Sequence, residues 1–512
     1  MTFIHIGYKI GILPDHMQNF DNLCFLPNSL SSQLHQTQQT QMKSSTVILY
    51  PSPGIGHLVS MVEIGKLIHT HHPSLSVVIL IIPAHYETGS TSNYINTVST
   101  TTPSITFHHL PAIPLPPDFS SDFEDLAFGI PELYNPVLHD TLVTISQTST
   151  IKAVILDFYV DAAFQVTKSL SLPTYYFYTS GASGLCGFLY SPYAHKTTCK
   201  SYKDVNDFLD IPGVPRMHSS YMPTAVSDRE SNSYKYFLKS ALNMAKSSGV
   251  IANSFFELEE RAAQTLRDGK CIPEGPTPPI YLIGPLLASG EQVNDDDEHE
   301  CLKWLKTQPS KSVVFLCFGS MGVFNKQQLK EIAFGLERSG KRFLWVVRKP
   351  MITDCENESS LKEFELEDVL PEGFLTRTRS KGMVVKNWAP QPAILGHESV
   401  GGFVSHCGWN SALEAVVCGV PIVAWPLYAE QKMNRVYLVE EIKVALWLEM
   451  SADGFVGADA VEETVRQLMD GEEGRAVRER VSEMSGRAKA AVEDRGSSRV
   501  DFLKLTRQWT DQ

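Results

Sequence analysis

Short apolar runs that alternate with helical segments are the feature that most restricts how this chain can fold. An apolar run at 46–50 is followed by apolar residues at helical spacing over 58–68, and then by a nearly continuous apolar run at 75–82. Such runs, rich in β-branched residues, are typical of strands that are buried on both faces. A strand, a helix and a strand in succession predict a βαβ unit and therefore a parallel sheet.

The same alternation occurs in two successive blocks of the chain. The first block continues with apolar runs at 105–108, 153–156, 174–178 and 250–253, and the second has runs at 313–317, 343–347, 383–386, 402–405 and 421–424. A chain of 512 residues is also too long for a single hydrophobic core. The blocks predict an α/β protein with two doubly wound, Rossmann-like domains that face a cleft.

Changes in composition suggest where these domains begin and end. Residues 1–41 lack a clean period and contain no Arg, which argues against a transit peptide, so we expect a disordered extension or a start codon assigned too early. We assign 42–272 to the N-terminal domain and 301–490 to the C-terminal domain. The Pro-rich and then acidic stretch 273–300 is the expected linker. A terminal helix is predicted within 491–512.

The composition is that of an ordinary globular protein, 43% hydrophobic and 20% charged. A net charge of −13 argues against a nucleic-acid partner. No run of 18 apolar residues is present, so we expect no stable membrane insertion. The nine cysteines are scattered, odd in number and without a CxxC pair, which argues against zinc or a disulfide framework. We expect a cytoplasmic protein, and we expect a monomer.

His57 is the first candidate for chemistry. It follows the run at 46–50 and the turn PSPGIG, at the start of a predicted helix. Open α/β sheets bind ligands beyond the carboxyl ends of their strands, which is where this side chain is expected. A helix N-terminus disfavours imidazolium, so the ring is expected to stay neutral and able to accept a proton from a hydroxyl. A helix-start histidine without a role is the alternative.

Asp157 ends the strand that contains the run at 153–156 and is the second candidate. A carboxylate there can bind the far ring nitrogen of His57, hold its tautomer and stabilise the charge formed on proton transfer. Asp161 is a nearby competitor for this role. An ordinary loop aspartate is the other interpretation.

The segment 388–431 reads WAPQPAILGHESVGGFVSHCGWNSALEAVVCGVPIVAWPLYAEQ. Trp388 can stack on a planar base, Ala389 can offer backbone groups to its edge, and Gln391 can reach a ribose hydroxyl. A turn after the run at 402–405 opens the next predicted helix, and backbone N–H groups there favour a diphosphate. The residues around this turn are His406, Gly408, Trp409, Asn410 and Ser411.

Three further residues of this segment carry groups suited to hydroxyls. Glu414, one turn into the helix, can accept hydrogen bonds from a ribose. Glu430 and Gln431, after the next strand, offer acceptors and a donor to a sugar. The 44 residues together resemble, almost position for position, the signature box of plant family 1 glycosyltransferases, which use UDP-sugars. The resemblance assigns the same roles to the matching positions, with the base being uracil.

The resemblance covers 43–510 and implies the two-domain glycosyltransferase B fold. The N-terminal domain would bind the acceptor, the C-terminal domain would bind the UDP-sugar, and the final helix would cross back to the N-terminal domain. The family's PxPGxGH segment carries its catalytic base, which matches His57, and its orienting acid matches Asp157. The family also has a phosphate-binding FGS segment that matches Ser320, and often a donor-contacting threonine that matches Thr179. A plain turn is the alternative at 318–320.

The implied activity is an inverting O-glucosyltransferase that forms a β-glucoside. Gln431 favours glucose, because members that prefer galactose often have His there. Neutral Trp409 argues against glucuronate, because members that use it tend to have Arg there. The branch resembled acts on flavonoids, isoflavones, chalcones and related phenols, which we expect to bind near 119–134 and 176–193. A triterpenoid or hormone acceptor, or another UDP-sugar, remains an alternative.

Other classes of function are disfavoured. A dinucleotide oxidoreductase needs a full GxGxxG fingerprint, and this chain lacks it. A non-catalytic nucleotide-sugar binding protein would be expected to have lost His57 or Asp157. The acidic run at 295–297 is read as a solvated charge run of the linker. We therefore expect no metal and no cofactor, with UDP-glucose as co-substrate.

Overall fold

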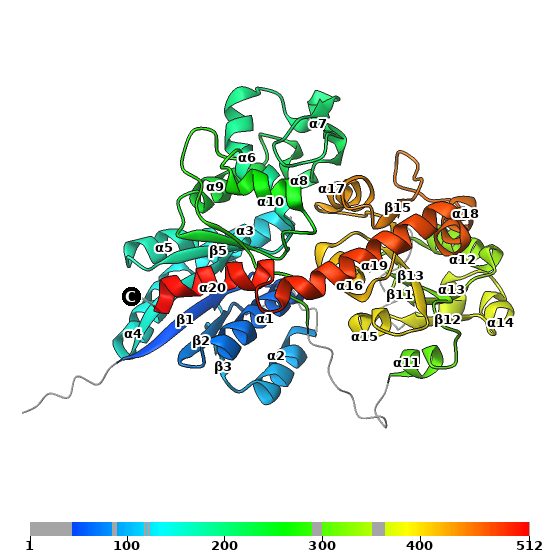
Figure 1. The fold of residues 1–512 in the computed structure, drawn as a ribbon, viewed down its shortest axis with the longest axis horizontal. Helices are drawn as coiled ribbons and strands as arrows, with labels where there is room; N and C mark the ends of the chain where they lie inside the picture. The colour runs from blue at the N-terminus through cyan, green and yellow to red at the C-terminus, as the bar shows by residue number, and fades with distance from the viewer. Residues whose placement is uncertain are drawn as a thin grey trace, which may run out of the picture. The chain divides into compact units, whose positions relative to one another are not determined.

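The computed structural model describes residues 43–83, 90–116, 119, 123–288, 299–350 and 364–510. The predicted extension at 1–41 and the acidic run at 295–297 lie outside the described residues. Residues 43–510 contain one parallel sheet of seven strands and another of six, each with helices on both faces (Figure 1). This confirms the predicted α/β class with two doubly wound domains.

The N-terminal sheet has the strand order β3-β2-β1-β4-β5-β8-β9, and all its neighbouring strands are parallel. Its strands are β1 (Ser44–Tyr50), β2 (Leu75–Ile81), β3 (Ile105–His109), β4 (Ser149–Asp157), β5 (Thr174–Tyr178), β8 (Gly249–Ala252) and β9 (Ile280–Leu282). The main helices packed around it are α1 (Ile55–His71), α2 (Ser90–Thr101), α3 (Phe123–Leu133), α4 (Asn135–Thr148), α5 (Ala163–Ser169), α6 (Ala182–Thr197), α9 (Asn232–Met244) and α10 (Glu260–Arg267).

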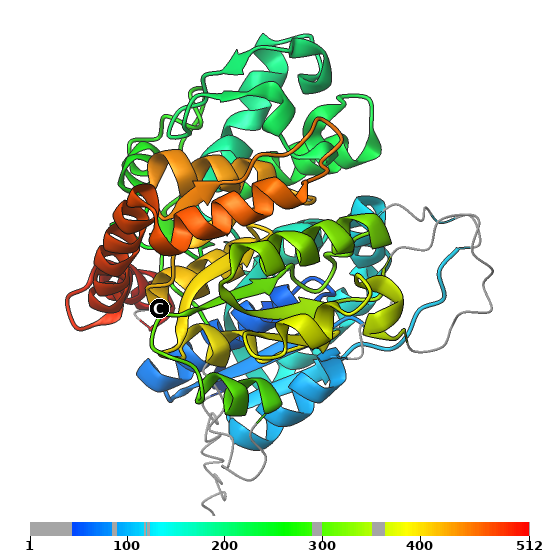
Figure 2. The ribbon, with the colours of Figure 1, turned by 90° about the vertical axis from the view of Figure 1, so that its right-hand side faces the viewer.

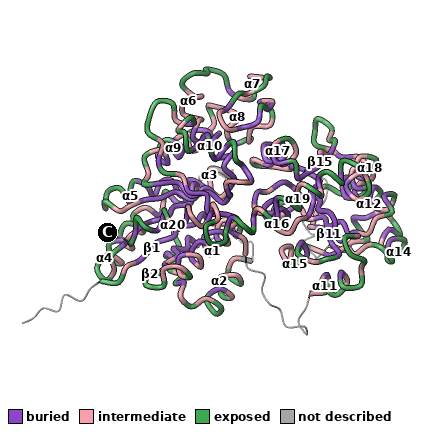
Figure 3. The backbone as a smooth tube through the Cα atoms, in the orientation of Figure 1, coloured by how far each residue is buried: buried purple, intermediate pink, exposed green. Residues whose placement is uncertain are grey.

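Strand β1 shows why the apolar runs of the sequence are nearly continuous. Val47 and Leu49 face the core shared with α1 and α2, whereas Ile48 and Tyr50 face the opposite core, shared with α4 and α6. Successive side chains of a strand point to opposite faces, so a strand covered on both sides needs apolar residues at every position. Figure 3 shows the central strands of both sheets as mostly buried.

The C-terminal sheet has the order β12-β11-β10-β13-β14-β15 and is also parallel throughout. Its strands are β10 (Val313–Cys317), β11 (Arg342–Val347), β12 (Gly382–Lys386), β13 (Val400–Ser405), β14 (Ile422–Ala424) and β15 (Ala445–Trp447). Its main helices are α12 (Lys326–Ser339), α15 (Gln391–Leu395), α16 (Trp409–Cys418), α17 (Gln431–Val436), α18 (Ala458–Asp470) and α19 (Glu472–Val492). Figure 2 turns this domain toward the viewer.

Strand β9 corrects the predicted linker. It lies inside the stretch 273–300 and pairs with β8 as the edge strand of the N-terminal sheet, so that sheet extends to Leu282. Three strand residues in a Pro-rich segment are too few to show a strand pattern. The edge is covered by the C-terminal helix, since Leu282 N donates to Asp501 Oδ2 at 3.2 Å.

Helix α20 (Ser497–Thr510) packs on the N-terminal sheet although it follows the C-terminal domain in sequence. Phe502, Leu505 and Trp509 lie in the same core cluster as one face of β1. Gln508 Oε1 accepts from Tyr175 Oη at 2.7 Å, and its Nε2 donates to Tyr281 Oη at 2.8 Å. The last helix thus ties the two domains together. Within the described ranges, no helix has the length and apolar character needed to cross a bilayer.

Candidate active site

His57 and Asp157 are hydrogen-bonded to each other. His57 lies in the first turn of α1, which follows β1, and Asp157 ends the neighbouring strand β4. His57 Nδ1 is 2.7 Å from Asp157 Oδ2, and Asp157 Oδ1 accepts from Tyr159 N at 3.0 Å. Asp157 is fully buried with both oxygens engaged. The parallel arrangement of β1 and β4 therefore brings together two groups that are 100 residues apart.

Asp161, the competing acid, is held elsewhere. Its Oδ1 accepts from Tyr176 Oη at 2.7 Å, and its Oδ2 accepts from Asn243 Nδ2 at 3.0 Å. Burial raises the pKa of this carboxyl group. Of the two aspartates, Asp157 is therefore the one that is bonded to His57.

The pKa of His57 depends on more than the helix N-terminus. Burial lowers the pKa of the imidazole, but the Asp157 carboxylate, its hydrogen bond and the charge of Glu430 outweigh burial, so the pKa of His57 is raised. Two carboxylates thus favour the imidazolium and oppose the effect of the helix N-terminus. His57 can accept a proton only at pH values at which the ring has lost its own.

A cavity of about 430 Å³ lies beside His57, and residues of both domains line it. This volume lies in the range of small-molecule sites. The N-terminal domain contributes His57, Thr179, several small and aliphatic residues, and seven aromatic side chains, namely Phe158, Tyr159, Tyr178, Phe188, Tyr202, Tyr234 and Phe237. The C-terminal domain contributes Met321, His406, Gly408, Tyr428, Ala429, Glu430, Gln431, Met433 and Asn434. The cavity therefore has an aromatic part and a polar part.

The two segments predicted for the acceptor differ in their placement. Residues of 176–193 line the cavity, whereas no described residue of 119–134 does. Phe128 instead stacks on Tyr236 behind the lining, with ring centroids 5.3 Å apart. Sequence reasoning missed the lining from 222–238, where helical spacing does not distinguish a cavity wall from a core.

The predicted base-binding residues follow strand β12. Trp388 is 64% exposed, an unusual position for a large aromatic side chain in a folded domain. Ala389 is buried beside it. Gln391 begins α15, and its Nε2 donates to Ser411 Oγ at 2.9 Å and to Glu414 Oε2 at 2.7 Å. Burial raises the pKa of Glu414 to about 7.

His406 lies against two glycines. A Cβ atom at Gly319 would lie 2.6 Å from His406 Nε2, and one at Gly408 would lie 2.4 Å from it. Gly319 also has a φ of +77°, which favours glycine. Burial lowers the pKa of His406 to about 4, so the ring is neutral at pH 7 and carries one N–H donor. Ser320 is exposed next to Gly319 and does not line the cavity.

Glu430 and Gln431 lie at the polar part of the cavity. Burial raises the pKa of Glu430, and its Oε1 accepts from Asn434 Nδ2 at 3.3 Å. Gln431 Oε1 accepts from the backbone N–H groups of Leu427 and Tyr428, both at 2.9 Å. Two backbone donors occupy the amide oxygen of Gln431 and fix the orientation of its amide.

Trp409 and Asn410 lie at the interface between the domains. Trp409 is 3% exposed, does not line the cavity, and donates from Nε1 to Asn253 O at 2.7 Å. Its indole packs on Gly181, where a Cβ atom would lie 2.5 Å from the ring. Trp409, which was predicted to bind the donor, therefore packs at the domain interface. Because its side chain does not reach the cavity, it gives no direct argument against glucuronate as the donor sugar. Asn410 Nδ2 donates to Gly56 O at 3.3 Å.

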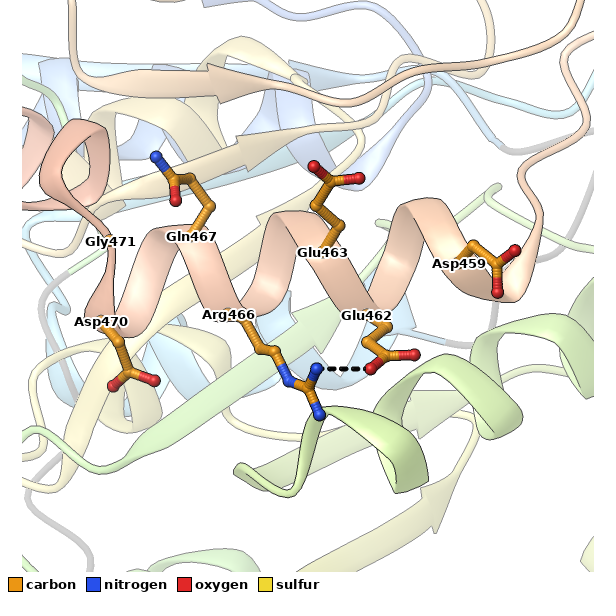
Figure 4. A pocket seen from close by; sticks show the side chains of 7 residues that line it. All are labelled: Asp459, Glu462, Glu463, Arg466, Gln467, Asp470 and Gly471. Carbon is orange, nitrogen blue, oxygen red and sulfur yellow. Dashed lines mark ion pairs between the residues drawn. The ribbon is translucent and has the colours of Figure 1, made fainter.

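A second hollow lies along α18, far from this chemistry (Figure 4). One helix supplies its lining, which is mostly charged, and Arg466 pairs with Glu462 at 2.6 Å. Its lining contains no aromatic side chain and no Ser, Cys or His, so we interpret the hollow as ordinary solvated helix surface. In the described part of the chain, no group of three or more His, Cys, Asp or Glu side chains is arranged to hold a metal ion.

Comparison with known proteins gives one consistent family. Residues 281–473 match the family model of UDP-glucoronosyl and UDP-glucosyl transferases. UDP-glycosyltransferase 88B1 of Stevia rebaudiana is 77% identical over 469 residues, which are 92% of this chain and 100% of that protein. Anthocyanidin 5,3-O-glucosyltransferase of a Rosa hybrid cultivar is 50% identical, over 91% of this chain and 99% of that protein.

A solved structure agrees with this result. Phytolacca americana UGT2, complexed with UDP-2fluoro-glucose and pterostilbene, matches with a TM-score of 0.82 and 34% identity, over 91% of this chain and 100% of that chain. The two sheets and their helices are thus the glycosyltransferase B fold. The chain belongs to the plant family 1 UDP-glycosyltransferases, as predicted, and is an enzyme of that class.

Proposed function

We propose that the enzyme is an inverting O-glucosyltransferase that moves glucose from UDP-glucose to a phenolic hydroxyl. One observation carries the proposal: His57, which is hydrogen-bonded to Asp157, lines the same cavity as Glu430 and Gln431. A base and groups suited to sugar hydroxyls therefore line one space. Such an arrangement fits a direct transfer between two bound substrates.

The proposed reaction is a single displacement. His57 takes the proton of the acceptor hydroxyl on Nε2, because Nδ1 faces Asp157. The oxygen then forms a bond to the anomeric carbon as the bond from that carbon to the diphosphate oxygen breaks. The electron pair leaves with UDP, and attack from the opposite side gives a β-glucoside. Asp157 stabilises the imidazolium formed in this step.

The leaving diphosphate is proposed to lie at the N-terminus of α16. Backbone N–H groups there are free of helical partners and favour an anion. The neutral His406 would donate a hydrogen bond to the diphosphate, and Ser320 would add another from its loop. These donors stabilise the charge as it develops on the leaving group, so we propose no metal in the reaction.

Glucose is the proposed sugar, and Gln431 supports it. Its amide oxygen is held by two backbone N–H groups, so the NH₂ group is the part that would donate to an acceptor oxygen of a sugar hydroxyl. Glu430 would accept from a neighbouring hydroxyl. Competition between UDP-glucose, UDP-galactose and UDP-glucuronate tests this choice, and a preference for either rival would refute it.

Aromatic side chains around the cavity support a phenolic acceptor. Phe158, Phe188 and Phe237 offer ring faces and edges to a planar molecule. The relative from rose is named for an anthocyanidin, and the Phytolacca americana structure holds pterostilbene, both of which are phenols. A flavonoid, isoflavone or chalcone is therefore the proposed class. A triterpenoid or hormone is the alternative.

Incubation with UDP-glucose and a panel of acceptors tests the function directly. The panel contains a flavonol, an isoflavone, a chalcone, a triterpenoid and a plant hormone, and mass spectrometry detects the gain of one hexose. Transfer to the phenols supports the proposal, and transfer to the triterpenoid alone contradicts it.

We further propose a cytoplasmic location, because the nine cysteines are scattered and odd in number, which does not suit a disulfide framework. A monomer stays a prediction.

A further inference from the structure

Arg435 is a buried cation at the junction of the two domains. It lies in α17, one turn after Gln431, and only 6% of it is exposed. Its Nη1 atom donates to Met450 Sδ, a weak acceptor, at 3.6 Å, and its Nε atom is buried without a hydrogen-bond partner among the described residues. Charged side chains are almost never buried in this way unless a partner replaces the lost water. Arg435 therefore needs a partner of another kind.

Two aromatic rings act as that partner. The Arg435 Cζ atom lies 3.6 Å from the centroid of the Trp447 ring and 5.2 Å from that of Tyr221. Trp447 ends β15 of the C-terminal domain, whereas Tyr221 ends η2 (Ser219–Tyr221) of the N-terminal domain. A guanidinium is attracted to the face of an aromatic ring, and the attraction is stronger where water is excluded. Arg435 thus joins the two domains through its contact with Tyr221.

Tyr221 leads directly into a wall of the cavity beside His57. The next residues along the chain line that cavity, namely Met222, Pro223, Ala225 and Val226. The segment follows a hairpin of two short strands, β6 (Phe208–Leu209) and β7 (Met217–His218). Because a two-stranded hairpin is only marginally stable by itself, it fixes the segment weakly. The contact with Arg435 supports the same segment from the other domain.

Helix α17 supplies both Arg435 and another wall of the cavity. Gln431 and Met433 of this helix line the cavity together with the segment 222–226. Gln431 and Arg435 are four residues apart, so they are neighbours on one face of the helix. The position of the segment is thus set relative to the residues that are proposed to bind the sugar.

We propose that Arg435 is a positioning residue for the acceptor, because its contact with Tyr221 holds the cavity wall at 222–226 against the C-terminal domain. This inference rests on the proposed use of the cavity for the acceptor. Without the contact, the wall would occupy its native position for only part of the time. The apparent affinity for a ligand falls with the fraction of the protein that is competent to bind it. Loss of the contact should therefore weaken acceptor binding, whereas a saturating acceptor should restore the native arrangement.

A mutant cycle on the two partners tests the proposal. The variants are Arg435→Leu, Tyr221→Leu and the double variant, and Tyr221→Phe keeps the ring. Lys432→Leu is the matched control, because Lys432 is an exposed cation of the same helix. Initial rates are measured at saturating UDP-glucose with increasing concentrations of the member of the acceptor panel that the native enzyme uses best. Hydrogen–deuterium exchange of 217–226 is followed by mass spectrometry without acceptor, and calorimetry with UDP shows that each variant is folded.

The expected change lies in the KM for the acceptor. Arg435→Leu should raise this KM about threefold to thirtyfold, the factor that corresponds to one buried cation–π contact. The kcat should stay within about threefold, because a saturating acceptor selects the native cavity. Tyr221→Leu should act alike and the double variant should be no worse, since both changes remove the same contact. Tyr221→Phe and Lys432→Leu should keep the native KM, and only the variants with Leu at 435 or 221 should speed exchange at 217–226.

Three results would overturn the inference. The first is an unchanged KM for the acceptor in Arg435→Leu with a lower kcat or melting temperature, which is the pattern of a residue that only stabilises the fold. The second is full additivity in the cycle, and the third is unchanged exchange at 217–226 in Arg435→Leu. If the native enzyme transferred glucose to no phenol of the panel, the proposed function would fail instead. The exchange measurement needs no acceptor, so it decides the role of Arg435 in that case as well.

Discussion

Replacement of Asp157 by Asn examines how the catalytic pair works. The change keeps the size of a side chain that is fully buried, and it removes one charge. Asp157 Oδ1 accepts from Tyr159 N, so the amide oxygen of the variant must occupy that position. The amide NH₂ then faces His57 Nδ1, which lies 2.7 Å from Oδ2 in the native protein. A donor at that position forces Nδ1 to become an acceptor.

The tautomer change places the ring proton on Nε2, which is the atom that must receive the proton of the acceptor. General base catalysis contributes about 10²–10⁴-fold to a rate, so the expected loss in kcat is of that order. This corresponds to about 3–5 kcal/mol in the activation barrier. In the opposite orientation, the amide NH₂ would face the Tyr159 N–H group. Two buried donors would then lack an acceptor, at a cost of about 1–3 kcal/mol.

The assay is the initial rate of glucoside formation at saturating UDP-glucose, followed by liquid chromatography. UDP affinity is measured in parallel and should match the native enzyme, because Asp157 lies in the N-terminal domain and does not line the cavity. The acid limb of the pH profile should also move to lower pH, since the carboxylate that raises the pKa of His57 is gone. A kcat within threefold of the native value would refute the reasoning.

Three further outcomes are expected. In the native enzyme, kcat/KM should fall as pH drops through the raised pKa of His57, above the ordinary value of about 6.5, because the protonated ring cannot accept a proton; a flat profile from pH 5 to 9 would contradict this. Trp388→Ala should raise the KM for UDP-glucose by the loss of about 1–3 kcal/mol of stacking, with an unchanged melting temperature because the ring is 64% exposed; an unchanged KM would exclude stacking. Gly181→Ala should destabilise the fold by about 1–3 kcal/mol, because its Cβ would lie 2.5 Å from the Trp409 ring; calorimetry that shows no loss of melting temperature would contradict this contact.

The placement of His57 and Asp157 could be predicted from the sequence for a topological reason. Each residue lies at the carboxyl end of an apolar run, and adjacent parallel strands bring such ends to the same edge of a sheet. The family could be recognised from the box at 388–431, because its residues are local in the sequence; their contacts with a UDP-sugar stay a prediction.

Features that depend on distant partners could not be read in the same way. Trp409 is buried by contacts with Gly181 and Asn253, more than 150 residues away, and no local pattern marks a tryptophan as an interface residue. The raised pKa of His57 could not be read from the local sequence, because Glu430, in the other domain, adds to the effect of Asp157. Helix periodicity likewise does not distinguish a cavity wall from a core.

The role of His57 as the base is most directly tested by His57→Ala with UDP-glucose and an un-ionised phenol. The predicted result is a loss of transfer of at least about 10²-fold while the Kd for UDP stays nearly the same, because the side chain lies in the N-terminal domain and the nucleotide is proposed to bind to the C-terminal domain. Full transfer activity in the variant would contradict the account.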